Sequence, residues 1–116
     1  MEKGKNNTDI PYLNETIRFI SKEINPEKII LFGSRARGNY RNDSDFDLFI
    51  VKNIPKEKVR ATRLLIRKLL LKLQLKNNIS FDIHVDSQDR IDYRTQIIQD
   101  QFYQDIFKNG EVIYAK

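Results

Sequence analysis

The sequence predicts a fold of the α/β class, more narrowly α+β, with one small mixed β-sheet and helices packed on it. Short segments rich in β-branched and aromatic residues alternate with longer segments whose apolar residues recur at helical spacing. The 116 residues, 40% of them hydrophobic and 32% charged, fit one globular domain over residues 1–116. A single sheet covered by helices buries both kinds of apolar face, in the order αββαβα with a closing strand.

The first half of the chain predicts a helix, a strand and a turn. Residues 10–24, IPYLNETIRFISKEI, are helical by the spacing of Leu13, Ile17, Ile20 and Ile24. Pro26 closes this helix because proline cannot continue it. Residues 28–32, KIILF, predict a buried strand, and GNYRND at residues 38–43 predicts a turn.

Two further strands are predicted by alternation of side chains along the chain. Residues 44–51, SDFDLFIV, place one set of side chains on each face: Phe46, Leu48 and Ile50 against Asp45, Asp47 and Phe49. Residues 79–85, ISFDIHV, do the same, with Phe81, Ile83 and Val85 inward and Asp82 and His84 on the opposite face.

Two amphipathic helices complete the predicted order. Residues 56–75 place Leu65, Leu69 and Leu73 along one side, with Ile66 and Leu70 beside them and Arg60, Arg63 and Arg67 away from that side. The last helix is expected from residue 89 to residue 107, with Asn109-Gly110 as its stop. Residues 111–115, EVIYA, predict the short closing strand.

Composition and charge exclude several classes of protein. Without cysteine there are no disulfides, thiolate metal sites or cysteine nucleophiles, which fits a cytoplasmic protein. No membrane-spanning stretch is visible, and the N-terminal MEKGKNNTDI lacks the apolar core of a signal peptide.

The net charge of +5 is concentrated in residues 52–76, which contain nine Lys or Arg residues and one acid. This segment predicts either a solvated face or an acidic partner. Direct nucleic-acid binding is not expected, because no aromatic residues lie between its charges.

A glycine–serine pair interrupts the strand at residues 28–32. Gly33 allows close backbone approach to a phosphate, Ser34 adds a hydroxyl donor, and Arg35 and Arg37 add positive charge. The spacing of Gly33 and Gly38 suggests a P-loop, but Asn39-Tyr40 stands where Lys and Ser or Thr are required. The dinucleotide-binding fingerprint also fails.

Three carboxylates on strand faces predict a metal site. Asp45 and Asp47 share a face, and Asp82 on a neighbouring strand can join them. Crowded carboxylates repel one another, so a cation must offset them or one must be protonated. Mg²⁺ bound through carboxylates and substrate phosphates is the usual chemistry of such a group, often as a pair of ions.

The longer pattern resembles a known family. Gly33-Ser34, ten intervening residues and Asp45-Phe46-Asp47 are similar to the signature of the DNA polymerase β-like nucleotidyltransferase superfamily. The segments GSRARG and SDFDL, with the preceding strand and the later FDIHV, resemble the minimal nucleotidyltransferases of prokaryotes. The resemblance covers residues 17–114 and implies the polymerase β-like nucleotidyltransferase fold.

This resemblance implies roles for particular residues. Gly33, Ser34 and Arg37 would bind the nucleotide, and Asp45 and Asp47 would hold Mg²⁺. Asp82 would be the third carboxylate, as metal ligand or as the base that takes the proton of the attacking hydroxyl. The attack would fall on the α-phosphate of a nucleoside triphosphate and would release pyrophosphate.

The resemblance also implies a partner. Minimal nucleotidyltransferases are often paired with a HEPN-domain toxin, and some transfer AMP from ATP to a tyrosine of that toxin and so act as antitoxins. A hetero-oligomer with the toxin is allowed. The alternatives are a non-catalytic antitoxin that neutralises the toxin by binding, and a small-molecule enzyme of the aminoglycoside-modifying kind. The sequence leaves open the acceptor, the nucleotide preference, the oligomeric state and the roles of Arg35, Arg37, Tyr40 and His84.

Overall fold

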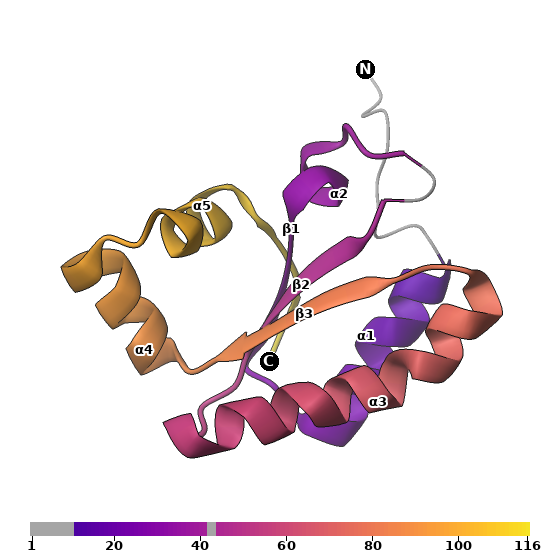
Figure 1. Cartoon of the computed structure of the whole chain (residues 1–116), viewed down its shortest axis with the longest axis horizontal. Coiled ribbons are helices and arrows are strands. Elements are labelled where there is room, and N and C mark those ends of the chain that lie inside the picture. Colours follow the sequence, from indigo (N-terminus) through magenta and orange to yellow (C-terminus); the bar gives the residue numbers. More distant parts are fainter. Residues whose placement is uncertain (1–10, 42–43) are drawn as a thin grey trace.

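A four-stranded mixed sheet forms the centre of the molecule, with helices on both of its faces (Figure 1). The computed structural model describes residues 11–41 and 44–116. The strand order is β3-β2-β1-β4, where β1 is Lys28–Phe32, β2 is Phe46–Val51, β3 is Phe81–Asp86 and β4 is Glu111–Ala115. β1 pairs antiparallel with β2 and with β4, whereas β2 pairs parallel with β3. The predicted fold class and the closing strand are confirmed.

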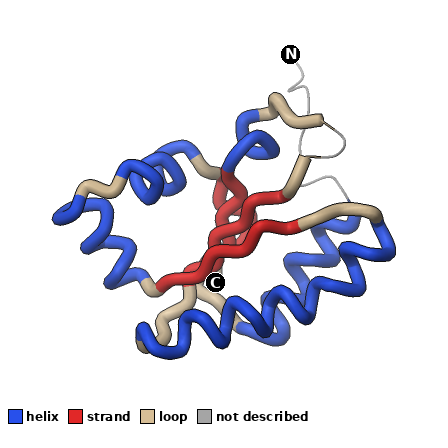
Figure 2. The backbone as a smooth tube through the Cα atoms, in the orientation of Figure 1, coloured by secondary structure: helices blue, strands red, loops and turns tan. Residues whose placement is uncertain are grey.

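The helices account for most of the remaining chain (Figure 2). They are α1 (Pro11–Ile24), α2 (Gly33–Arg37), the 3₁₀ turn η2 (Lys56–Lys58), α3 (Val59–Asn77), α4 (Gln88–Asp92), the π-helix η3 (Tyr93–Ile98) and α5 (Gln101–Asn109). Within residues 11–41 and 44–116, no helix has the length and apolar character needed to cross a bilayer. Ile10 of the first predicted helix, and Asn42 and Asp43 of the predicted turn, lie outside the described residues.

The larger core lies between the sheet and the helices α1 and α3, which lie together on one side of it (Figure 1). Alternation along β2 and β3 sends every second side chain into this core, as predicted: Phe46, Leu48, Ile50, Phe81, Ile83 and Val85. α1 ends at Ile24, where Asn25 adopts a left-handed φ of 53° and Pro26 follows. Burial of apolar side chains on this face therefore sets the register of the strands.

A second, smaller core lies on the opposite face, under α4 and α5. It contains side chains from four elements, β1, β2, α4 and α5: Ile30, Phe32, Phe49, Val51, Ile91 and Ile106. Tyr103 and Phe107 of α5 pack against its edge. The face that carries Asp47 and Asp82 is thus covered along most of its length by aromatic and aliphatic side chains.

The prediction of one final helix over residues 89–107 is wrong. The chain forms α4, continues as the π-helix η3, breaks, and starts again as α5. Gln99 takes a left-handed φ of 58°, and the Asp100 side chain accepts hydrogen bonds from the backbone N–H groups of Phe102 and Tyr103. Asp100 therefore acts as an N-cap, and a capping aspartate starts a new helix within an otherwise continuous helical pattern.

The apolar side of α3 is rotated from the predicted one. Ile66, Leu70 and Leu73 are buried, Leu69 is half-buried, and Leu65 is 48% exposed. The sequence placed Leu65 in the main stripe with Leu69 and Leu73. The structure instead centres the stripe on Ile66 and Leu70, because these face the sheet.

Two adjacent substitutions test this rotation. We expect Ile66→Ala to lower the free energy of unfolding by about 2–5 kcal/mol, because it leaves a cavity in the core. Leu65→Ala, its matched neighbour, should change that free energy by less than about 1 kcal/mol, since half of its side chain already meets solvent. Urea unfolding of both variants measures the difference. Equal losses would contradict the observed rotation of α3.

Candidate active site

Strand pairing brings two of the predicted carboxylates together. In β1 and β2 the Cα partner of Phe32 is Asp47, and in β2 and β3 the Cα partner of Asp47 is Asp82. Partners in register point to the same face of a sheet, so Asp47 and Asp82 lie side by side. Since Phe32 is the last residue of β1, this pair lies at the end of β1. Figure 1 shows that β1 runs directly into α2 at that end.

Asp45, the third predicted carboxylate, precedes β2 and is exposed. Its Oδ1 accepts a short hydrogen bond from the hydroxyl of Ser80, which precedes β3. This contact ties together the two segments that lead into the paired strands. Sequence reasoning did not single out Ser80, because nothing local to β3 shows that it faces an aspartate 35 residues earlier in the chain.

The electrostatics of Asp47 show that the carboxylates form one cluster. Burial is the largest cause that raises the pKa of Asp47 above its ordinary value of 3.8, and the charges of Asp82 and then Asp45 raise it further. His84 and Arg37 oppose this rise in the pKa of Asp47. The negative charge of the group is therefore only partly offset by the protein itself.

Gly33 lies directly against this cluster. It has a φ of 75°, and a Cβ atom added to it would come within 2.1 Å of Oδ2 of Asp47. The glycine is therefore required twice, by its left-handed backbone and by the close approach of the carboxylate. The glycine–serine turn and the Asp-x-Asp pair, separated by ten residues in sequence, meet at this point.

A cavity of about 300 Å³ lies beside Gly33. One wall comes from Phe32, Gly33, Ala36 and Arg37, and the other from Asp105, Asn109 and Gly110 at the end of α5. Gly33 and Arg37 therefore line one space, with Asp105 on its other wall. Ser34, half-buried, is not among the residues that line it. The nucleotide-binding roles of all three residues stay predictions.

Arg35 has a structural role within the loop that follows α2. It is 3% exposed, and its Nε and Nη2 donate to the carbonyl oxygen of Ser44 at 3.3 and 3.0 Å. Its guanidinium lies 4.2 Å from the ring centroids of both Tyr40 and Phe46. The two arginines of the motif thus differ: Arg35 holds the loop, and Arg37 lies at the cavity.

His84 contacts the cluster from the same strand as Asp82. Its Nε2 lies 3.3 Å from Oδ2 of Asp82, and its ring stacks on Phe49 with 11° between the ring planes. Phe102 of α5 packs on His84 at 5.4 Å between centroids. The imidazole is therefore fixed by aromatic rings while it contacts the carboxylate. The contact between Phe102 and His84 was not identifiable from sequence, because a separate α5 was not predicted.

The donor chemistry of the cluster fits Mg²⁺. Among the described residues, no three acidic or histidine side chains are grouped so that they could hold a metal ion by themselves. Asp47 and Asp82 lie in register, however, and Mg²⁺ usually binds one or two carboxylates together with substrate phosphates. The residues present thus suit an ion whose coordination is completed by the substrate. That Asp45, Asp47 and Asp82 all bind metal stays a prediction.

Comparison with known proteins agrees with this arrangement. The family "Polymerase beta, Nucleotidyltransferase" matches residues 14–116. A Methanocaldococcus jannaschii protein with the provisional name protein adenylyltransferase MJ0604 is 33% identical over 88 residues, which cover 76% of this chain and 78% of the relative.

Two solved structures are similar in fold. A toxin–antitoxin protein solved with AMP-PNP gives a TM-score of 0.58 at 17% identity, over 89% of this chain and 73% of that one. A Sulfolobus solfataricus protein, provisionally described as a nucleotidyltransferase, gives 0.56 at 20% identity, over 100% of this chain and 93% of that one.

Fold, glycine turn and paired carboxylates together define a nucleotidyltransferase domain. The chain belongs to the polymerase β nucleotidyltransferase family. The family predicted from the GSRARG and SDFDL segments is therefore confirmed, and the protein is a nucleotidyltransferase.

The two glycines of the motif offer a matched test of the contact with Asp47. Gly33→Ala and Gly38→Ala each place a side chain at positive φ, which should cost about 1–2 kcal/mol of the free energy of unfolding at Gly38 and at least that much at Gly33. Only the alanine at position 33 would displace a carboxylate, because nothing lies within 4 Å of a Cβ at Gly38. We expect nucleotidyl transfer to fall by more than about tenfold for Gly33→Ala alone. Urea unfolding and an activity assay separate the two effects, and equal activity of both variants would contradict the contact.

Repulsion within the cluster predicts that Asp47→Asn stabilises the metal-free protein. A carboxyl whose pKa is raised by folding contributes stability when protonated and loses it as pH rises through its folded-state pKa. At pH 7.5 we therefore expect a melting temperature a few degrees above that of the wild type, measured in EDTA. The advantage should shrink as pH falls toward 3.8, the ordinary pKa of the group. Asp89→Asn, at an exposed position on α4, is the control. A melting temperature of Asp47→Asn below that of the wild type would contradict repulsion among the carboxylates.

Proposed function

We propose that this protein transfers AMP from ATP to a tyrosine hydroxyl of a partner HEPN-domain toxin and thereby acts as its antitoxin. The observation that carries the proposal is the contact of Gly33 with Asp47, which itself pairs in register with Asp82. A turn suited to phosphates and carboxylates suited to Mg²⁺ meet in one place, as nucleotidyl transfer requires.

The residues divide between positioning the nucleotide and holding the metal. Gly33 permits close backbone approach to the triphosphate, Ser34 donates its hydroxyl to it, and Arg37 supplies positive charge from the cavity wall. Asp45 and Asp47 would hold Mg²⁺, which when bound neutralises negative charge that develops on the phosphate oxygens. Asp82, beside them, completes the acidic cluster.

The reaction is an in-line displacement at the α-phosphorus. The acceptor oxygen forms a bond to that phosphorus, the bond to the oxygen bridging the α- and β-phosphates breaks, and pyrophosphate leaves. The proton of the acceptor hydroxyl passes to a carboxylate, for which Asp82 is the exposed candidate. His84, 3.3 Å from Asp82 and packed against aromatic rings, holds that carboxylate in place.

The names of two similar proteins support a protein as acceptor and ATP as nucleotide. The M. jannaschii relative is named for adenylyl transfer to protein, and it shares a third of its aligned residues with this chain. The toxin–antitoxin structure was solved with AMP-PNP, an analogue of ATP. The tyrosine, the HEPN toxin and the use of Mg²⁺ come from the resemblance of the motif and belong to the proposal.

Labelling of the toxin tests the catalytic assignment. With radiolabelled ATP and Mg²⁺, the wild-type protein should label a HEPN-domain protein whose gene adjoins its own, and Asp45→Asn or Asp47→Asn should lower the rate by at least about a hundredfold, or about 2.7 kcal/mol in activation free energy. Asp89→Asn should label at the wild-type rate. Persistent labelling by the Asp45→Asn/Asp47→Asn double variant would remove these residues from the mechanism.

The same variants distinguish catalysis from neutralisation by binding. If the antitoxin acts by modification, cells that express the toxin should survive with wild-type protein and die with the double variant at equal expression. Equal survival would favour the non-catalytic antitoxin, in which complex formation alone blocks the toxin.

A further inference from the structure

A second hollow, far from the carboxylates, has strongly cationic walls. It encloses about 730 Å³ between the first turns of α3, the end of β3 and the segment formed by α4 and η3. Five of its lining side chains are cationic: Lys56, Arg60, Arg63, Arg90 and Arg94. Four of these are arginines, whose planar guanidinium groups bind carboxylates through paired hydrogen bonds.

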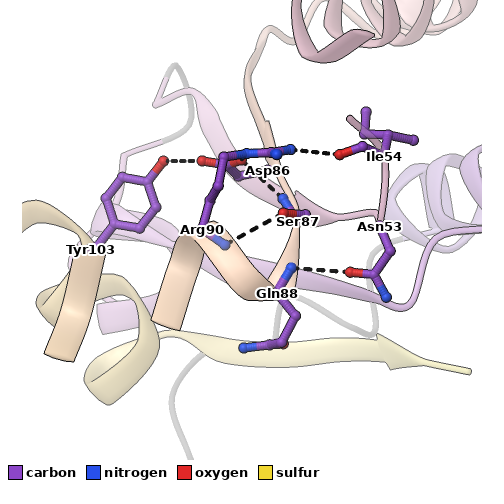
Figure 3. Close-up of polar contacts among 7 residues, drawn as sticks. All are labelled: Asn53, Ile54, Asp86, Ser87, Gln88, Arg90 and Tyr103. Atoms are coloured by element: carbon purple, nitrogen blue, oxygen red, sulfur yellow. Dashed lines mark hydrogen bonds and ion pairs between the residues drawn. The ribbon is translucent and has the colours of Figure 1, made fainter. Parts of the chain in front are cut away.

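Among the described residues one acid, Asp86, lines the hollow, and groups of the protein itself already bind it. Asp86 accepts hydrogen bonds from the Tyr103 hydroxyl at 2.8 Å and from the backbone N–H of Ser87 at 3.0 Å, and it pairs with Arg90 (Figure 3). Burial, and then the hydrogen bond to Asp86, raise the pKa of Tyr103 far above its ordinary value, so it stays a neutral donor. Arg90 also donates to the carbonyl oxygen of Ile54 at 2.7 Å. Asp86 therefore compensates Arg90, and Arg94 is paired with Asp100 at 3.1 Å, which leaves the cations of η2 and α3.

The cations contributed by η2 and α3 have no such compensation. Among the described residues, the side chains of Lys56 and Arg60 have no hydrogen-bond or ion-pair partner, and the Nε of Arg63 is buried without an acceptor. The first turn of α3 also contains no acid. Cations at the N-terminus of a helix oppose its dipole, so this end of α3 favours an external anion.

Exposed apolar side chains lie beside these cations. Tyr93, which lines the hollow, is 54% exposed, and Ile97 and Ile98 of the same π-helix are 66% and 51% exposed. π-Helices are rare and occur frequently at functional sites. Arginine and tyrosine are enriched among the residues that contribute most of the binding energy of protein–protein interfaces.

We propose that this hollow docks an acidic segment, containing an aromatic or aliphatic side chain, of the protein that accepts the nucleotidyl group. The acceptor protein is the one named in the proposed function, so this inference rests on that function. A single-stranded nucleic acid fits less well, because such sites stack successive bases on several aromatic rings, and among the described residues that line the hollow Tyr93 is the only aromatic one. A second copy of this chain would bring a net charge of +5 against a cationic wall.

The position of the hollow separates docking from chemistry. Asp82 is the second residue of β3 and Asp86 the last, four residues apart, which corresponds to ~13 Å along a strand. α5 packs between them, with Phe102 against His84 and Tyr103 against Asp86. The docked segment and the modified hydroxyl are therefore different parts of the acceptor surface.

Binding of a model acidic polymer, without ATP or Mg²⁺, tests the docking surface apart from catalysis. The probe is a fluorescein-labelled poly(Glu,Tyr) copolymer, followed by anisotropy at low ionic strength. We expect Lys56→Glu/Arg60→Glu to weaken its binding by at least about tenfold, as loss of central interface charges does. Lys68→Glu/Lys72→Glu, an equal change of charge at exposed positions of α3 outside the hollow, should weaken it by less than about threefold. Arg63→Lys keeps the charge but removes the guanidinium, and it should also weaken binding.

Other results of these binding assays would contradict the proposal or identify a different ligand. Equal weakening by the two double variants, or no binding of the copolymer by the wild type, would overturn the proposal. A fluorescein-labelled oligothymidylate is the second probe. If the wild type binds it more tightly than the copolymer, and the Lys56→Glu/Arg60→Glu variant loses that binding, the hollow is a nucleic-acid site instead. Asp45→Asn/Asp47→Asn protein should bind the copolymer like the wild type, so a failed labelling assay and a failed docking assay are distinguishable.

Discussion

The parallel pairing of β2 with β3 is the constraint on which the rest of the structure depends, because it places Asp47 beside Asp82. Like charges in register on neighbouring strands repel each other, and this pairing would be unfavourable in an isolated sheet. The opposite face of the same strands offsets that cost by burying Leu48 and Ile83 under α1 and α3. Since side chains alternate, a shift of one residue would move these apolar side chains to the face of the carboxylates and bring the carboxylates into the larger core. The apolar face therefore determines where the acids lie, and the acids contribute function at the expense of stability.

The parts of the fold that were predictable are those in which burial follows a local period. The alternation in β2 and β3 gave the inward faces correctly, because a strand with one strongly apolar face leaves a single choice of register. The final helical segment failed because residues 89–107 keep a helical spacing of apolar residues across the break at Gln99. There the capping bonds of Asp100 outweigh the periodic pattern, and a capping aspartate is identifiable in sequence only when a helix start is already expected. The rotation of α3 depended on which of two adjacent residues, Leu65 or Ile66, meets the sheet, and a leucine-rich helix does not specify that locally.

The candidate site shows the same division between local and distant information. The ten-residue spacing of Ser34 and Asp45, in the context of strand, turn and strand, was enough to expect phosphate-binding and acidic groups in one place, and the structure brings Gly33 and Asp47 into contact. Contacts from elsewhere in the chain were not predictable. Ser80 reaches Asp45 across neighbouring segments, and Arg35, which the sequence offered as a phosphate ligand, is buried in the loop. Such assignments require the packing of side chains, which a single sequence does not contain.

The distribution of charge follows from the same packing and explains how one small domain carries both a dense acidic cluster and a basic helix. The buried side of α3 faces the sheet on the side opposite the carboxylates, so the basic residues of 52–76 are directed away from them. The side chains that lower the pKa of Asp47 are His84 and then Arg37, and neither belongs to that segment. At physiological ionic strength, charges ~13 Å apart along β3 are separated by more than the screening length of about 8 Å. The carboxylates thus remain available to a metal ion, and the cations at the far end of β3 remain available to an acidic partner, because the sheet keeps the two from pairing with each other.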